Sequence, residues 1–260
     1  MPNTRTDGTT PAAQRKRRSR ALRWTLWGLL AVVVLVIVGT IAWSQIGVMS
    51  AEPEPLAKAR ANPDLVIEDA PQGIVLTPAD GASTEGLVFI PGAKVQPEAY
   101  IAILHDVAAV DGVTVVITRP WLNLAFFDLR GLDAFTSAAP DIDTWMVGGH
   151  SLGGVRGCQL ADGADALLLF ASYCANDLSD SDLPVLSLSG SEDGLSTPQK
   201  IADARHLLPA DAEMIEIDGA SHASFGDYGP QPGDGTPTIS DDDMHARVTE
   251  LVGDFASTLH

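Results

Sequence analysis

The sequence predicts an α/β fold, a mostly parallel β-sheet flanked by helices on both faces, preceded by one transmembrane helix. From about residue 66 onward, short apolar runs alternate with stretches of helical periodicity, and the later runs are continuously apolar. Strands of that kind are buried on both faces, which is typical of parallel sheets covered by helices. A separate uncharged segment near the N-terminus, residues 24–43, is long enough to cross a bilayer.

The expected strands and helices follow one another in this order. Strand character is found in GIVLTP, EGLVFI, VTVVIT, TWMVGG, ALLLFAS, PVLSLS and EMIEI. Apolar residues at helical spacing predict helices over residues 98–110, 152–160, 197–207 and 241–257. Ser240 is expected to cap the last helix, with Asp243 completing a capping-box pattern. The preceding loop, GDYGPQPGDGTPTIS, lacks the spacing of a calcium loop, so we interpret it as a solvated loop.

The N-terminus combines a basic tail with the apolar segment. Residues 1–23 hold seven of the 16 Lys and Arg residues and a single acidic residue. The 20 helical residues that follow reach about 30 Å, the thickness of bilayer hydrocarbon. Trp24, Trp27 and Trp43 stand near the two ends of the segment, as interfacial aromatic residues do.

These features predict a single-pass protein of the cell membrane. Residues 1–23 would be a basic cytoplasmic tail, 24–43 a transmembrane helix in the lipid bilayer, 44–65 a linker, and 66–260 a folded extracytoplasmic domain. A cleaved signal peptide is the alternative, although its apolar region would be unusually long and Val48 and Ser50 offer a poor cleavage site. Cys158 and Cys174 would lie outside the cytoplasm, where a disulfide is permitted, but two buried free thiols fit the sequence equally well.

Charge and cysteine usage exclude some partners. The net charge is −18, and because basic residues concentrate in the tail, the rest of the chain is strongly acidic. Binding to nucleic-acid phosphates needs clustered Lys and Arg, so no nucleic acid partner is expected. Two cysteines without a histidine at ligand spacing cannot complete a zinc site, so no metal is expected either.

The clearest chemical signal is GGHSLGG, the glycine-rich stretch around Ser151. It follows the predicted strand TWMV and precedes the helical sequence VRGCQLA. A Gly-x-Ser-x-Gly turn between a strand and a helix lifts the serine above the sheet on a strained backbone, where it can act as a nucleophile. The stretch lacks the Gly-Lys-Ser/Thr ending of a phosphate-binding loop. Because a serine hydroxyl is weak without a base and oxyanion donors, the chain must supply both.

Asp193 and His222 are the expected partners of Ser151. Each follows the end of a predicted strand, and the chain order Ser, Asp, His brings all three to the carboxyl edge of a parallel sheet. Taken singly, Asp193 could be a turn residue with Glu192 as a competing carboxylate, and His222 could be structural. Together the three residues predict a catalytic triad with Ser151 as nucleophile, His222 as base and Asp193 as its orienting carboxylate.

Two backbone amides are expected to form an oxyanion hole. Leu152 follows the nucleophile at the N-terminus of its helix. Ala93 lies in the loop after EGLVFI, where Gly92 lets the backbone turn toward the serine; an ordinary Pro-Gly turn is the alternative.

Substrate-binding residues are expected in the loop after VTVVIT, whose sequence is RPWLNLAFFD. Its apolar residues are candidates for an acyl-binding wall, although core packing would also explain them. The candidates are Trp121, Leu122, Phe126 and Phe127.

Five segments resemble a small, cap-poor member of the α/β-hydrolase superfamily, similar to the dienelactone-hydrolase-like group: VFIPGAKVQPEAY, NLAFFD, GGHSLGG, GSEDG and GASHASFGDYGPQPGDG. The similarity covers about residues 66–260. It implies an α/β-hydrolase fold and hydrolysis of a small-molecule carboxylic ester, thioester or lactone through an acyl-enzyme, without a cofactor. One departure concerns the oxyanion loop, where many relatives carry His-Gly and this chain has Pro91-Gly92. The alternative is a non-catalytic, membrane-anchored binding or scaffold protein with the same fold.

Overall fold

The N-terminal unit is a single long helix. The computed structural model describes residues 11–81 and 83–259, without the side chains of residues 11–21. The chain divides into two units, Met1–Ile46 and Gly47–His260. In the described part of the first unit the chain forms helix α1 (Pro11–Gln45), and its segment Leu22–Gln45 is apolar and long enough to cross a membrane, as expected. A signal sequence has the same character, and residues 1–10 of the expected basic tail lie outside the described residues.

The second unit is built on an eight-stranded sheet in the order β1-β2-β4-β3-β5-β6-β7-β8. Strand β2 pairs antiparallel with β1 and β4, and all other neighbours pair in parallel. The expected α/β fold with a mostly parallel sheet is therefore confirmed. The strands are β1 (Leu65–Ala70), β2 (Gly73–Pro78), β3 (Glu85–Ile90), β4 (Thr114–Thr118), β5 (Thr144–His150), β6 (Ala166–Phe170), β7 (Val185–Gly190) and β8 (Glu213–Ile217).

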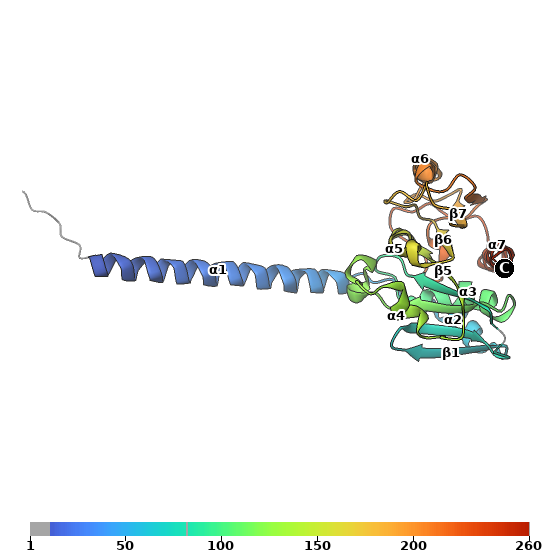
Figure 1. Ribbon diagram of the computed structural model, residues 1–260, viewed down its shortest axis with the longest axis horizontal. Helices are drawn as coiled ribbons and strands as arrows, with labels where there is room; N and C mark the ends of the chain where they lie inside the picture. Colours follow the sequence, from blue (N-terminus) through green and yellow to red (C-terminus); the bar gives the residue numbers. More distant parts are fainter. Residues whose placement is uncertain (1–10, 82, 260) are drawn as a thin grey trace, which may run out of the picture. The chain divides into compact units, whose positions relative to one another are not determined.

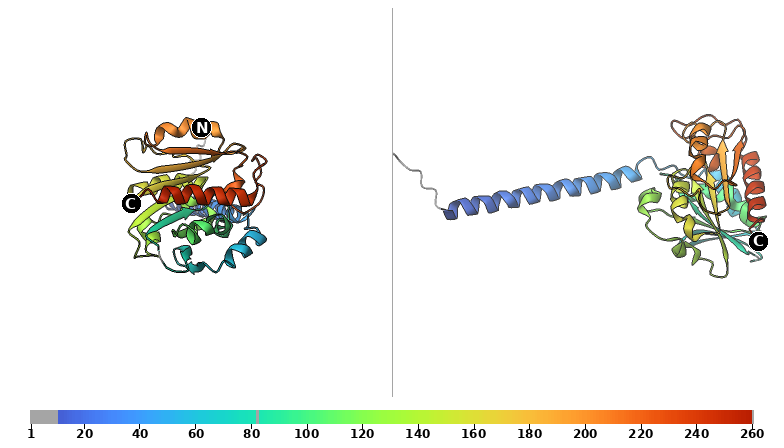
Figure 2. Two further views of the ribbon diagram at one scale, coloured as in Figure 1. Left: turned by 90° about the vertical axis from the view of Figure 1, so that its right-hand side faces the viewer. Right: turned by 45° about the horizontal axis from the view of Figure 1, so that its top comes forward.

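Helices cover both faces of the sheet (Figures 1 and 2). Along β3, Leu87 and Phe89 pack in one apolar cluster with α3 and α7, and Val88 packs in a second cluster with α4 and α5. This alternation leaves the inner strands buried on both sides, which explains their continuously apolar sequences. The helices of this unit are α2 (Pro53–Arg60), α3 (Ile101–Ala109), α4 (Leu132–Thr136), α5 (Leu152–Leu160), α6 (Pro198–Ala204) and α7 (Asp241–Ala256).

Short 3₁₀ turns connect several of these elements. They lie at Pro97–Tyr100, Trp121–Asn123, Ala125–Phe127, Ala161–Gly163, Arg205–Leu207 and Ala223–Phe225. The expected cap of α7 is present, because the Ser240 hydroxyl accepts the Asp243 N–H at 3.2 Å and donates to the Asp243 carboxylate at 2.6 Å.

Residues 47–65 differ from the expected linker. The backbone of Met49 bonds to Lys94 and Gln96 at 2.7 and 2.9 Å, and α2 buries Ala59 in the core. Pro53 opens α2 at a first-turn position, where its missing N–H costs nothing. The packed unit therefore starts at Gly47, earlier than the expected boundary at residue 66. The short apolar face of α2 is obscured in the sequence by its prolines and charges.

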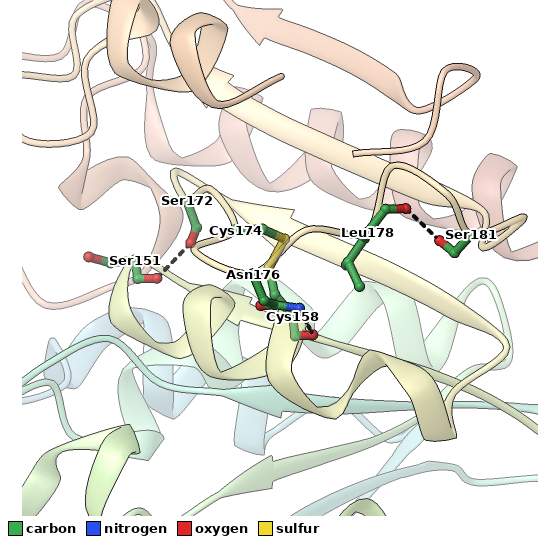
Figure 3. The surroundings of a disulfide bond; sticks show 7 residues. All are labelled: Ser151, Cys158, Ser172, Cys174, Asn176, Leu178 and Ser181. Carbon is green, nitrogen blue, oxygen red and sulfur yellow. Dashed lines mark hydrogen bonds between the residues drawn. A yellow bond between two sulfur atoms is a disulfide. The ribbon is translucent and has the colours of Figure 1, made fainter. Parts of the chain in front are cut away.

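A disulfide joins Cys158 of α5 to Cys174 in the loop after β6, which decides between the alternatives left open by the sequence (Figure 3). The amide of Asn176 donates to the Cys158 carbonyl at 3.1 Å, beside the disulfide. This loop is therefore fastened to the C-terminal half of α5.

The turn after α3 contains a destabilised carboxylate, that of Asp111. Burial, together with the nearby charges of Asp254 and Asp106, raises the pKa of Asp111 from 3.8 to about 6. Its Oδ2 atom is buried without a hydrogen-bond partner among the described residues. This pKa is higher in the folded state than in the unfolded state. Between pH 3.8 and about 6 the folded state therefore binds more protons than the unfolded state. The free energy of unfolding therefore falls as pH rises from 3.8 to about 6.

We expect Asp111→Asn to stabilise the protein at neutral pH. The half-buried carboxylate is partly screened by solvent, so the expected gain in the free energy of unfolding is only about 1 kcal/mol at pH 7. At pH 4 the gain should nearly vanish, because the wild-type carboxyl is then protonated in the folded state. Urea denaturation of both proteins at the two pH values tests this; equal midpoints at pH 7 would contradict it.

Candidate active site

Ser151 sits on a strained turn between β5 and α5. Its backbone angles are φ 53° and ψ −121°, a conformation that residues other than glycine rarely adopt. Hydrogen bonds hold the turn on both sides: the Ser151 N–H donates to the Phe170 carbonyl at 3.0 Å, and the Ser172 hydroxyl donates to the Ser151 carbonyl at 2.7 Å. Figure 3 shows the contact with Ser172. The structure thus presents Ser151 at the strand-to-helix turn that the motif predicts.

The N-terminus of α5 lies against the end of β3. A Cβ atom added at Gly153 would stand 1.9 Å from the Ile90 carbonyl oxygen and 2.6 Å from that of Pro91, so a larger residue would force the two elements apart. Strand β3 has β4 on one side and β5 on the other, so the strand order reverses there. Ligands of open α/β sheets bind at such switch points.

Asp193 and His222 form a buried pair beyond the ends of β7 and β8. His222 Nδ1 lies 2.9 Å from Asp193 Oδ2, and the two residues are 1% and 4% exposed. The other oxygen of Asp193 accepts the N–H groups of Leu195 and Ser196 at 2.7 Å each. A carboxylate so placed keeps the imidazole proton on Nδ1 and leaves Nε2 as the acceptor. The competing carboxylate of Glu192 is exposed.

Ser151 lies next to this pair through its chain neighbour His150. The ring centroids of His150 and His222 are 4.5 Å apart. Within the described residues, the hydrogen bonds of Ser151 run through its backbone, and its hydroxyl is not bonded to His222. The structure therefore joins two of the predicted site residues, and the third is the chain neighbour of His150, whose ring contacts that of His222. Contacts between a nucleophile and its base are often long in enzymes without substrate.

The two expected oxyanion donors lie on neighbouring elements. In the loop after β3, the Gly92 N–H donates to the Tyr100 hydroxyl at 2.9 Å and the Lys94 N–H donates to the Asn123 carbonyl at 2.8 Å. The Ala93 N–H between them has no acceptor among the described residues. Leu152 opens α5, so its N–H has no acceptor within the helix. Both amides are therefore available, and their role stays a prediction.

A buried polar network that the sequence analysis missed connects this loop to the serine turn. The Tyr100 hydroxyl accepts from Gly92 and lies 2.9 Å from His150 Nδ1, to which it can donate its own proton. Burial raises the pKa of Tyr100; burial and the nearby His222 lower the pKa of His150. Both groups are therefore neutral at pH 7. The position of His150 inside the motif was the only sequence signal for this network.

The candidate substrate-binding residues lie in the loop after β4. Trp121 is 76% exposed, Phe126 and Phe127 are each 46% exposed, and Leu122 is half-buried. Core packing therefore does not account for the three aromatic residues. The hydrogen bond from Lys94 to Asn123 fastens this loop to the loop that carries Ala93. Contact with substrate stays a prediction for all four.

Comparisons with known proteins agree with this architecture. The esterase domain of a Rhodothermus marinus protein is similar in structure, with a TM-score of 0.54 and 16% identity over 71% of this chain and 91% of that one. Est1E from Butyrivibrio proteoclasticus has a TM-score of 0.52 and 13% identity over 75% of this chain and 99% of that one. None of the curated protein sequences compared matches the chain.

A family model provides the assignment. The model described as "Alpha/beta hydrolase family" matches residues 86–246, more than half of the chain. The matched residues include the Ser151 turn, Asp193 and His222, which the geometry brings to one edge of the sheet. The chain belongs to the alpha/beta hydrolase family.

Proposed function

We propose that the protein is a serine hydrolase that cleaves carboxylic ester, thioester or lactone bonds. The observation that carries the proposal is the buried hydrogen bond between His222 Nδ1 and Asp193 Oδ2, 2.9 Å long, beside a serine held at positive φ. An imidazole oriented by a carboxylate next to a serine is the arrangement that activates a hydroxyl for acyl transfer. One of the two similar structures is named as an esterase domain, which points to the same reaction class.

Each of these groups has a role in the proposed reaction. Ser151 Oγ attacks the acyl carbon while His222 Nε2 takes its proton, and the same proton then passes to the leaving alkoxide or thiolate. The resulting acyl-enzyme is hydrolysed when His222 takes a proton from water and returns it to Ser151. Asp193 stabilises the imidazolium in both steps. Charge on the substrate oxygen is received by the amides of Leu152 and Ala93, each worth about 3 kcal/mol where such donors have been removed.

The substrate is a small or exposed ester. The three aromatic residues after β4 are exposed, so they suit substrate groups that remain partly in solvent. The amides that receive the oxyanion belong to backbone and do not discriminate between ester, thioester and lactone carbonyls.

A fluorophosphonate probe, which reacts only with activated serines, tests the proposal. We expect wild-type protein to be labelled and Ser151→Ala to lose the label completely. The control is Ser257→Ala, which removes an exposed hydroxyl at the end of α7 and should keep the label. An unlabelled, folded wild type would favour the binding or scaffold function instead.

The apolar segment of α1 is proposed to anchor the enzyme in the cell membrane, with Gly47–His260 outside the cytoplasm. The disulfide supports an extracytoplasmic location, because such bonds persist in oxidising compartments. The same labelling on fractionated cells separates an anchor from a signal peptide. A labelled band of full length in the membrane fraction supports the anchor, and a shorter soluble band contradicts it.

A further inference from the structure

Asp234 lies in the loop between the His222 turn and α7, where the sequence suggests only a solvated segment. Its carboxylate is half-buried and accepts several backbone N–H groups. Oδ1 accepts from Gly194 and His222 at 3.1 Å each and from Gly235 at 2.7 Å, and Oδ2 accepts from Ala223 at 2.8 Å. One side chain therefore binds both loops that carry the acid and the base of the proposed triad.

The donors are placed next to the functional residues. Gly194 directly follows Asp193, and the N–H of His222 belongs to the base itself. The N–H groups of Gly194 and His222 both donate to Oδ1 of Asp234, so this carboxylate fixes the distance between the loop after β7 and the loop after β8. The 2.9 Å hydrogen bond between His222 and Asp193 joins the same two loops. Among the hydrogen bonds of the described residues, those of Asp234 go to backbone N–H groups and none goes to the imidazole or the Asp193 carboxylate, so it acts through the backbone.

The loop containing Asp234 is pressed against the loop after β7. A Cβ atom added at Gly235 would stand 1.8 Å from the Glu192 carbonyl oxygen, so glycine is required there for the carboxylate to reach its donors. Burial alone would raise the pKa of Asp234; the N–H groups of Ala223, Gly194 and His222 outweigh it and lower the pKa. The carboxylate is therefore ionised at neutral pH, and charge-assisted bonds are the stronger kind.

We propose that Asp234 is a positioning residue that holds the His222 loop and the Asp193 loop in register for hydrolysis. The proposal rests on the function proposed above, because its effect on rate is transmitted through that pair. It assigns a role to the Gly-Asp-Gly sequence at residues 233–235.

Two substitutions of Asp234 should act in a graded way. Asp234→Ala removes all four hydrogen bonds. Asp234→Asn keeps one acceptor oxygen, but its NH₂ group would face either the Ala223 N–H or the N–H groups that bond Oδ1, and an N–H group cannot accept a hydrogen bond. The matched control is Asp218→Asn, which removes one exposed carboxylate from the loop between β8 and His222.

The first readout is the second-order rate constant of fluorophosphonate labelling. This constant measures the reactivity of the folded molecules, so a variant that is partly unfolded does not give a lower value for that reason alone. We expect a fall of about 100-fold for Asp234→Ala and about 10-fold for Asp234→Asn, the cost of misplacing reacting groups by a fraction of an ångström to 1 Å. Asp218→Asn should match wild type. With an ester substrate, kcat should fall and KM should stay, since the proposed role of Asp234 is to position the His222–Asp193 pair and not to bind substrate.

The second readout is the far-downfield proton resonance of His222 Nδ1–H in histidine-labelled full-length protein, which reports its bond to Asp193 independently of activity. Loss or shift of this resonance in both Asp234 variants, with retention in Asp218→Asn, supports the positioning role. An unchanged resonance in folded Asp234→Asn overturns it, as does a labelling rate equal to that of wild type. If wild type is not labelled, the hydrolase function fails, while the resonance still decides the role of Asp234.

Discussion

Asp193→Asn is expected to lower kcat by about 10⁴-fold while leaving the fold intact, because the substitution reverses the direction of one hydrogen bond. In the wild type, Asp193 Oδ1 accepts two backbone N–H groups and Oδ2 faces His222 Nδ1. The asparagine oxygen must remain with the two N–H donors, so its NH₂ group faces the imidazole. His222 then has to accept at Nδ1 and carry its proton on Nε2.

An imidazole protonated on Nε2 cannot take the proton of Ser151, and the base of the mechanism is lost. The measurement is steady-state hydrolysis of a chromogenic ester by Asp193→Asn and by the control Glu192→Gln, which removes the same charge from the exposed neighbouring residue. Glu192→Gln should keep wild-type activity. A value of kcat for Asp193→Asn within tenfold of wild type would show that Asp193 does not orient the base.

Removal of the disulfide is expected to have the largest effect on stability. Cys158 and Cys174 are 16 residues apart, and closing a loop of that length restricts the unfolded chain by about 3 kcal/mol. The double variant Cys158→Ser, Cys174→Ser should therefore lose about 3 kcal/mol in the free energy of unfolding. For a domain of this size, the melting temperature should fall by roughly 10 °C.

The loss should also weaken α5, which carries three glycines in nine residues, LGGVRGCQL, and has little intrinsic helical stability. Thermal unfolding of the wild type and the double variant, each with and without reductant, measures the effect. Reductant should lower the melting temperature of the wild type only. Equal melting temperatures for the two proteins under oxidising conditions would contradict the prediction.

The sequence predicted the elements that are buried on both sides better than those at the edges. Inner strands such as ALLLFAS are continuously apolar, so their type and order were readable, and the mostly parallel sheet followed. Strand β1 was missed because four of its six residues are charged, small or exposed at the sheet edge. Helix α2 was missed because few of its residues face the core.

Within the candidate site, the motif residues could be predicted from the sequence, but the residues that hold their loops in place by hydrogen bonds could not. Ser151, Asp193 and His222 each follow a strand, so chain order alone suggested that they meet. Tyr100 and Asp234 act through hydrogen bonds to backbone groups that are distant in sequence or hidden in a loop, and such contacts leave no periodic signal. The pairing of Cys158 with Cys174 likewise depends on a distance that the sequence does not contain.

The acidic outer strands bear on how copies of the protein meet one another. A sheet ends in backbone N–H and C=O groups that can recruit a strand from a second molecule. Here β1 exposes Glu68, and β8 at the opposite margin exposes Glu213 and Glu216. When the sheet edges of two molecules approach each other, their negatively charged carboxylates face one another. Copies at high local concentration should therefore repel each other and resist association into fibrils.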